Sequence, residues 1–105
     1  MIDEIRAKIG DGLFEFSKNA VDQSILRNIS VDYLIESIAN GTIIEEYPDD
    51  KYGPSCLIFG LTRAGRPLHC QCSYPSRETL KIITLYQPDA DLWIDFTARR
   101  KPGGG

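Results

Sequence analysis

The spacing of apolar residues changes at Asn40-Gly41, and this change constrains the fold more than any other feature of the sequence. Before it, apolar residues recur every three or four positions, as on one face of an amphipathic helix. After it, they alternate with polar residues, as in strands that are buried on one side. Helices followed by consecutive strands are typical of an α+β domain. The 105 residues are enough for one hydrophobic core and too few for two.

Three segments before the change have helical spacing. The first carries Ile2, Ile5 and Ile9 and ends at Gly10. The second spans about residues 18–27 after the capping residue Ser17, and a short extended piece precedes it. The third has the cleanest apolar stripe, with a serine cap before it and Asn40-Gly41 as its stop. The second and third helices are therefore predicted at residues 18–27 and 31–39.

Four segments after the change predict strands joined by short, turn-forming connections. They are residues 42–47, 55–62, 68–74 and 80–87. Short connections imply an antiparallel meander. Residues 89–96 then predict a turn and a short helix with Trp93 and Phe96 as anchors. The expected architecture is α+β, with N-terminal helices packed on a four-stranded antiparallel sheet and a short C-terminal helix. One domain would span residues 1–98, followed by a flexible, basic and glycine-rich tail, 99–105.

Alternation in the two central strands predicts which face of the sheet is buried. The predicted core face consists of Leu57, Phe59, Leu61, Cys70 and Cys72. Pairing Thr62 with Pro67 satisfies both strands and places His69 opposite Gly60, on the other face. Because glycine has no side chain, we expect the imidazole of His69 to be accessible. Cys56 would lie half-buried on that same open face.

The fourth predicted strand has an ambiguous parity, because Ile82 competes with Ile83 and Leu85 for the core. We assign Ile83 and Leu85 to the core, which leaves Thr84 and Tyr86 on the open face. The open face is then expected to present His69, Gln71, Thr84 and Tyr86.

Composition excludes several classes of function. A net charge of −3 argues against indiscriminate binding to nucleic acid, because such binding depends on lysine and arginine. No apolar run is long enough to cross a bilayer, and the first ten residues lack the apolar stretch of a signal peptide. The three cysteines are an odd number and are expected to be reduced thiols. These features together predict a cytoplasmic protein.

Metal binding is not expected from the residues that could supply ligands. His69 and Cys70 are neighbours on a strand and point to opposite faces, so they do not share a tetrahedral site. The acidic run 45–50 lacks the spacing of a calcium loop and is interpreted as a solvated edge and turn. We predict no metal and no cofactor.

His69 is the one histidine of the chain and therefore its best candidate acid or base near neutral pH. The alternative is an ordinary surface residue of a strand. Arg27, at the end of the second helix, is interpreted as complementing the C-terminal dipole of that helix.

An ordered set of short motifs resembles one known family over about residues 14–93. The motifs are Phe16-Ser17-Lys18-Asn19-Ala20, Arg27-Asn28-Ile29-Ser30, Ile44-Glu45-Glu46-Tyr47-Pro48-Asp49-Asp50, Tyr52-Gly53-Pro54-Ser55-Cys56-Leu57, Gly65-Arg66-Pro67-Leu68-His69 and Ile83-Thr84-Leu85-Tyr86-Gln87-Pro88-Asp89. The family that they resemble is the domain of unknown function 4258 family. It has been grouped with RelE-like and barnase-like ribonuclease toxins, and its members are often encoded beside zinc-finger antitoxins.

The resemblance implies a toxin-like bacterial ribonuclease that needs no metal, with RNA as substrate and a zinc-finger antitoxin as partner. It implies that His69, Tyr86 and Arg27 are catalytic. The implied substrate-binding residues are Lys18, Asn19, Arg66, Gln71 and Thr84. One position departs from the family, which has histidine where this chain has Asn19. Asparagine cannot exchange a proton near neutral pH, so a catalytically inactive relative that acts as a protein- or RNA-interaction domain is the alternative.

Overall fold

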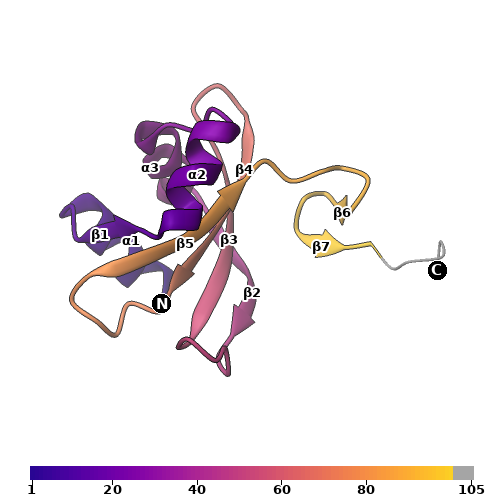
Figure 1. Cartoon of the computed structure of the whole chain (residues 1–105). Helices are drawn as coiled ribbons and strands as arrows, with labels where there is room; N and C mark the ends of the chain where they lie inside the picture. The colour runs from indigo at the N-terminus through magenta and orange to yellow at the C-terminus, as the bar shows by residue number, and fades with distance from the viewer. Residues whose placement is uncertain (101–105) are drawn as a thin grey trace.

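The computed structural model describes residues 1–100, which form a sheet with helices on one face and a small hairpin against the other (Figure 1). The helices are α1 (Ile2–Gly10), α2 (Lys18–Leu26) and α3 (Val31–Ala39). The sheet strands are β1 (Phe14–Phe16), β2 (Thr42–Tyr47), β3 (Ser55–Leu61), β4 (Pro67–Ser73) and β5 (Leu80–Tyr86), in the order β1-β5-β4-β3-β2. The separate hairpin consists of β6 (Trp93–Ile94) and β7 (Ala98–Arg99).

Most ends of the helices and long strands lie within one residue of the bounds predicted from the sequence. Local signals explain the agreement at α2 and α3. The hydroxyl oxygen of Ser17 accepts a bond from the Ala20 amide, and that of Ser30 accepts one from the Tyr33 amide. Each serine thus satisfies an amide that the first helical turn leaves without a partner.

The prediction of a four-stranded antiparallel sheet was wrong, because the sheet has five strands and is mixed. Residues Phe14–Phe16, expected only as an extended piece, pair in parallel with β5. The Leu80 amide donates to the Leu13 carbonyl, and the Ser17 amide donates to the Ile82 carbonyl, both at 2.9 Å. A strand of three residues carries too little pattern to reveal a partner so far along the chain.

The predicted register between β3 and β4 was wrong by one residue, so Phe59 and not Gly60 lies opposite His69. Gly60 decides the register because it faces α3. A Cβ atom at Gly60 would overlap the carbonyl oxygen of Ser37 and lie 2.6 Å from the carbonyl carbon. Only glycine allows α3 to pack this closely. The face of β3 that meets the helices therefore carries Cys56, Ile58 and Gly60, in place of Leu57, Phe59 and Leu61.

The assignment of β5 was half correct. Leu85 is buried in the core as expected, and Tyr86 and Thr84 pair with His69 and Gln71. A register shift between Gln71 and Cys72 then places Ile82, and not Ile83, in the core. A bulge of this kind reverses the alternation of side chains, which explains why both isoleucines competed in the sequence.

The predicted C-terminal helix was also wrong, because this segment forms the β6–β7 hairpin. Asp95 and Phe96 both have positive φ, at 50° and 61°, which is incompatible with a right-handed helix. The Thr97 amide donates to the Ile94 carbonyl at 3.0 Å and closes the turn. We call residues 87–100 the C-terminal arm. Of the predicted tail, Arg99 and Arg100 are described and belong to this arm, and the rest lies outside the described residues.

The core lies between the helices and the sheet. Its central members are Ile5, Leu34, Ile38, Ile58, Leu68, Cys70, Leu80, Ile82 and Leu85, each at most 1% exposed. Within residues 1–100 no helix has the length and apolar character that a membrane crossing requires.

Candidate functional site

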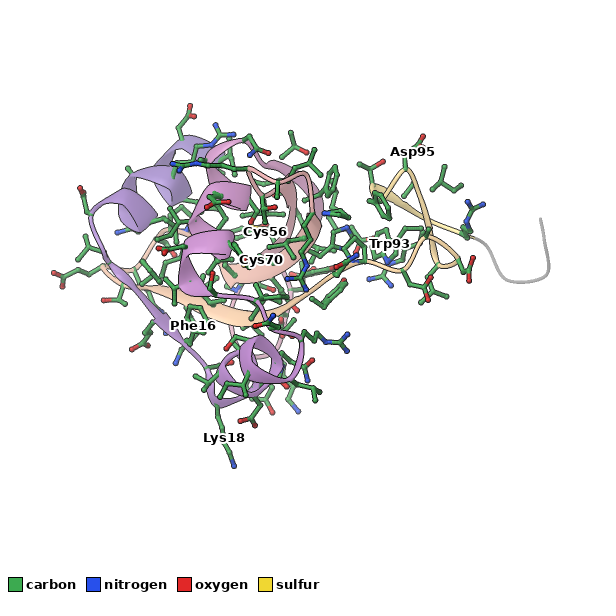
Figure 2. The ribbon with its side chains drawn as sticks, turned by 90° about the horizontal axis from the view of Figure 1, so that it is seen from above. Phe16, Lys18, Cys56, Cys70, Trp93 and Asp95 are labelled. Atoms are coloured by element: carbon green, nitrogen blue, oxygen red, sulfur yellow. The ribbon has the colours of Figure 1, made fainter. Side chains whose placement is uncertain are left out.

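The sheet face opposite the helices carries a group of polar and aromatic side chains under the C-terminal arm. We call this group the His69 cluster. It consists of Glu45 and Tyr47 from β2, Phe59 from β3, His69 from β4, Tyr86 from β5, and Trp93, Phe96 and Arg99 from the arm. Figure 2 shows Trp93 on the side of the hairpin that faces the sheet, with Asp95 at the tip. The cluster thus joins segments that are distant in the sequence.

Both ring nitrogens of His69 have hydrogen-bond partners. Nε2 lies 2.6 Å from the carbonyl oxygen of Phe96, and Nδ1 lies 3.2 Å from the hydroxyl of Tyr86. A carbonyl oxygen can only accept, so Nε2 carries the proton and Nδ1 accepts from Tyr86. His69 is 0% exposed, which corrects the prediction of an accessible imidazole. The cause is the arm, which covers a face that the sequence predicted to be open.

Three aromatic rings pack against the imidazole. The ring centroid of Trp93 lies 4.5 Å from that of His69 at an interplanar angle of 89°. The ring of Tyr86 lies at 5.3 Å and that of Phe59 at 5.9 Å, both in edge-on arrangements. Edge-to-face geometry is favourable for aromatic pairs. These contacts hold the imidazole in one orientation.

Burial shifts the pKa values of the two central groups in opposite directions. Desolvation lowers the pKa of His69 below its ordinary 6.5, although the bond to Phe96 and the charge of Glu45 partly oppose this. Desolvation also raises the pKa of Tyr86 above its ordinary 10.0. At neutral pH, His69 is therefore a neutral imidazole and Tyr86 a neutral phenol.

Glu45 and Arg99 form a two-point ion pair that ties β7 to β2. The Nε and a terminal nitrogen of Arg99 donate to the two carboxylate oxygens of Glu45 at 2.9 and 3.1 Å. The guanidinium also lies 4.7 Å from the ring centroid of Trp93. The bonds from Arg99 lower the pKa of Glu45, so this carboxylate is ionised at neutral pH.

Tyr47 completes the polar side of the cluster. Its hydroxyl donates to Glu45, and desolvation together with this bond raises its pKa to about 12. It therefore remains a donor over the whole physiological range of pH.

Gln71 and Thr84 share the face of His69, as predicted, but lie outside the cluster. They pair across β4 and β5. The amide nitrogen of Gln71 donates to the hydroxyl of Ser55 at 3.0 Å. Both are half-buried, and a substrate-binding role for them remains a prediction.

Arg27 and Arg66 lie at the C-terminal end of α2 and have no described contact with His69. The guanidinium of Arg66 donates to the carbonyls of Arg27 and Asn28, both at 2.9 Å, and to Gln87 at 2.8 Å. All three bonds are internal, and two of them satisfy carbonyls at the helix end. Arg27 is exposed and donates to Gln23.

Lys18 and Asn19 lie at the start of α2, away from the cluster. Lys18 points away from the body of the protein (Figure 2). The side-chain amide of Asn19 lies 3.4 Å from the carbonyl oxygen of Ile83. The structure therefore separates the residues implied by the resemblance into four groups: His69 with Tyr86, Gln71 with Thr84, Arg27 with Arg66, and Lys18 with Asn19.

The cysteines lie on the helix side of the sheet. Cys56 was expected on the open face, but it is 0% exposed and its sulfur lies 3.9 Å from that of Cys72. Burial raises the pKa of Cys70, which keeps this thiol protonated. Among residues 1–100, no three side chains of histidine, cysteine, aspartate or glutamate are gathered as a metal site would require.

Sequence reasoning missed Glu45, Trp93 and Arg99 as members of the site. Glu45 was interpreted as part of a solvated edge and Arg99 as part of the tail. The alternation in β2 does contain a signal, because Glu45 and Tyr47 share one side of the strand. Nothing in the sequence pairs Glu45 with Arg99, since 54 positions separate them.

Comparison with protein families finds one match. The family is described as a domain of unknown function (DUF4258), and its model matches residues 16–87, which is more than half of the chain. The match includes His69 and Tyr86 and ends where the C-terminal arm begins. Comparison with curated proteins and with solved structures finds no significant match.

Proposed function

The chain belongs to the family described as a domain of unknown function (DUF4258), and we propose that it is a toxin-like endoribonuclease that cleaves RNA without a metal ion. One observation carries the proposal: His69, Tyr86 and the Glu45–Arg99 pair converge on one face of the sheet. These are an acid–base pair and a guanidinium, which are the groups needed when the ribose 2′-hydroxyl attacks the adjacent phosphate. In this proposal the chain is a relative of the RelE-like and barnase-like toxins.

His69 is the base in this reaction. A phenolic hydroxyl can donate or accept, so once the turn is displaced the imidazole can release its Nε2 proton to water, take a proton from water at Nδ1 and keep its bond to Tyr86. The lone pair of Nε2 then becomes free to take the proton of the 2′-hydroxyl. The lowered pKa of His69 supports this role, because a base must be unprotonated at the working pH.

Tyr86 is the acid. With its oxygen accepting from Nδ1 of His69, its own proton is free for the 5′-oxygen as the phosphorus–oxygen bond breaks. The products are a 2′,3′-cyclic phosphate and a 5′-hydroxyl. The proton on Nδ1 then passes to the phenolate, which returns both side chains to their neutral forms. The 3.2 Å separation of the two groups supports this relay.

Arg99 stabilises the phosphorane through its second terminal nitrogen, Nη1, which makes no described bond to Glu45. Its guanidinium lies 4.7 Å from the ring centroid of Trp93, whose ring lies 4.5 Å from that of His69, and Glu45 holds it by two bonds. An arginine that is fixed in advance stabilises developing negative charge without first having to reorganise. In this proposal Arg99 replaces Arg27, Lys18 and Arg66 as the phosphate contact, because Arg99 packs on Trp93 within the His69 cluster and those three lie outside it.

RNA must displace the turn of the C-terminal arm to reach Nε2 of His69. The Phe96 carbonyl occupies Nε2 of His69, at the position that the 2′-hydroxyl would take. Phe96 has a φ of 61°, which is unfavourable for a bulky side chain. This local strain favours movement of the turn, while the Glu45–Arg99 pair keeps β7 attached to β2.

An RNA cleavage assay in the presence of a metal chelator tests the proposal. The wild-type protein should cleave single-stranded RNA to 2′,3′-cyclic ends. His69→Ala should lose at least about 10²-fold in rate, the usual contribution of a general base. Tyr86→Phe keeps the ring and its packing, so a comparable loss there would exclude misfolding as the cause. No cleavage by the wild type, or equal cleavage by wild type and His69→Ala, would refute the catalytic claim.

The cellular role follows from the same proposal. Expression in bacteria should arrest growth, and co-expression of a zinc-finger antitoxin encoded beside the gene should restore it. Arrest that persists in His69→Ala would contradict RNA cleavage as its cause.

A second candidate function is a catalytically inactive protein-interaction domain. The outer face of α2 favours it, because Val21, Ile25 and Leu26 are 41%, 75% and 76% exposed. Neighbouring exposed apolar side chains are typical of surfaces that bind another protein. The replacement of the family histidine by Asn19 is also consistent with lost catalysis.

Affinity capture with the product of the neighbouring gene tests this second candidate. Ile25→Ser combined with Leu26→Ser should abolish capture if α2 is the interface. A matched control is Leu92→Ser, which alters an exposed leucine of the arm. Recovery of no partner, or equal capture by all three proteins, would count against an interaction through α2.

A further inference from the structure

A groove of about 490 Å³ lies on the same side of the sheet as the His69 cluster, at the opposite end of β4 and β5. The β2–β3 and β4–β5 connections form two of its walls, at the lower end of the sheet in Figure 1. Its volume is within the range of small-ligand pockets. None of the residues assigned to catalysis lines it.

Two tyrosines give the groove aromatic surfaces. Tyr52 is 83% exposed, with the Lys51 ammonium 4.9 Å from its ring centroid. Tyr74, the residue after β4, also lines the groove, and its hydroxyl donates to Glu46 at 3.1 Å. Exposed aromatic rings beside cations are the surfaces on which proteins stack nucleobases.

Arg77 is the cation available to an anionic ligand. It is exposed and lines the groove, and within residues 1–100 it has no ion pair and no side-chain hydrogen bond. Lys81 also lines the groove but is paired with Glu15 at 3.1 Å. The Arg77 guanidinium can therefore grip a phosphate group through two hydrogen bonds.

The acidic side chains in the walls are already engaged. Glu15 is neutralised by Lys81. One carboxylate oxygen of Asp50 accepts from the Tyr52 amide at 3.3 Å, and the other accepts from the Ser55 hydroxyl at 3.1 Å. The hydroxyls of Ser76 and Thr79 also line the groove and can bond a sugar, whereas those of Ser17 and Ser73 already make internal bonds.

We propose that this groove binds a nucleoside monophosphate unit, with Tyr52 stacking on the base and Arg77 contacting the phosphate. The inference rests on the proposed function, because it makes the groove a subsite for one residue of the RNA strand. Ser73 is four residues from His69 along β4, which is about 13 Å at the usual rise of a strand. A single strand lying along β4 can reach both places.

Titration calorimetry with two probes tests the groove. The probes are adenosine monophosphate and a hexa-adenylate with 2′-O-methyl groups, which cannot be cleaved. Arg77→Ala and Tyr52→Ala should each weaken binding at least fivefold, roughly the smallest effect expected for losing a stacked base. Both side chains are exposed, so these variants should fold normally.

The matched control is Arg63→Ala, which removes the same charge from the exposed β3–β4 turn. It should bind within about twofold of the wild type. Arg77→Ala should also reduce the slope of log K against log salt by about 0.7, the value for one phosphate contact with a single strand. An equal loss in Arg63→Ala, or no binding of either probe by the wild type, would overturn the proposal.

The two probes distinguish the source of the nucleotide. A hexa-adenylate that binds much more tightly than the monophosphate supports an RNA residue, and similar affinities support a free nucleotide. Binding through Arg77 without any RNA cleavage would refute the ribonuclease proposal alone. Cleavage that is unaffected by Arg77→Ala and Tyr52→Ala, with unchanged binding, would refute the groove alone.

Discussion

The Nε2 atom of His69 lies 2.6 Å from the carbonyl oxygen of Phe96, so the one histidine of the chain is bonded to the turn of the C-terminal arm. This bond makes the arm both a part of the site and an obstacle to it. It also makes the imidazole a direct reporter of whether the arm is docked.

Trp93→Ala should undock the arm and expose His69. Trp93 is 5% exposed and covers the imidazole edge-on, so its loss removes much of the desolvation that lowers the pKa of His69. The pKa of His69 should therefore rise toward its ordinary 6.5. A proton NMR titration measures this directly, because the chain has one histidine.

The control for this prediction is Leu92→Ala, whose side chain is 62% exposed on the same arm. It should leave the titration curve of His69 unchanged. A pKa of His69 that stays equally low in Trp93→Ala would show that the arm does not cause the shift.

Stability should fall as the pH drops below about 6.5, because His69 is held neutral in the native state. Its native pKa lies below its ordinary 6.5, so the unfolded chain binds a proton that the folded protein does not. The contribution of neutral His69 to the free energy of unfolding is complete at pH values above its ordinary pKa. This contribution declines as the pH falls below that value, and the decline levels off below the native pKa of His69.

Urea unfolding at pH 7.5 and 5.5 measures this loss. The wild type should lose more free energy of unfolding between these two values than His69→Gln, which has no group that titrates at this position. An equal loss in both proteins would assign the pH dependence to other groups.

The Glu45–Arg99 pair should couple β2 to the arm by about 0.5–1 kcal/mol, at the upper end for exposed ion pairs because it has two bonds. A double-mutant cycle with Glu45→Gln and Arg99→Ala measures the coupling free energy. The coupling should weaken at high salt. The single-contact pair Glu15–Lys81 serves as the comparison and should couple less strongly. A larger coupling free energy for Glu15–Lys81 than for Glu45–Arg99 would contradict the role of Arg99 in tying the arm to β2.

Gly60→Ala should destabilise the fold by about 2–3 kcal/mol or more, because the new methyl group would overlap the Ser37 carbonyl of α3. Backbone cannot move aside as a flexible side chain can. Gly10→Ala is the matched control, because a Cβ there has no atom within 4 Å and the residue is helical. It should be neutral or stabilising by up to about 1 kcal/mol. Thermal unfolding compares the two, and similar melting temperatures would refute the role of Gly60.

Local signals in the sequence predicted the elements well. Ser17 and Ser30 cap the helices where expected, and the strands β2 to β5 begin and end within one residue of their predicted bounds. Each of these features depends on a few consecutive residues. His69, Gln71, Thr84 and Tyr86 share the face on which they were predicted, although the parity of β5 was ambiguous in the sequence.

Contacts between distant segments decided the rest. The sequence could not reveal that Phe14–Phe16 pairs with β5, nor that Gly60 faces Ser37. Either face of β3 is apolar enough to be buried, so alternation alone could not choose between them. The close approach of α3 made the choice, and the bulge at Gln71 made a similar choice between Ile82 and Ile83.

The sequence alone determined an α+β domain, the positions of its helices and long strands, and the placement of His69 on the face of β4 opposite Cys70 and Cys72. Only the tertiary structure decided that this face is covered. Residues 89–96 contain helical spacing, but positive φ at Asp95 and Phe96 turns them into a hairpin over the imidazole. Local periodicity reports the side on which each element is apolar. It does not report which other segment covers that side, because that depends on packing across the whole chain.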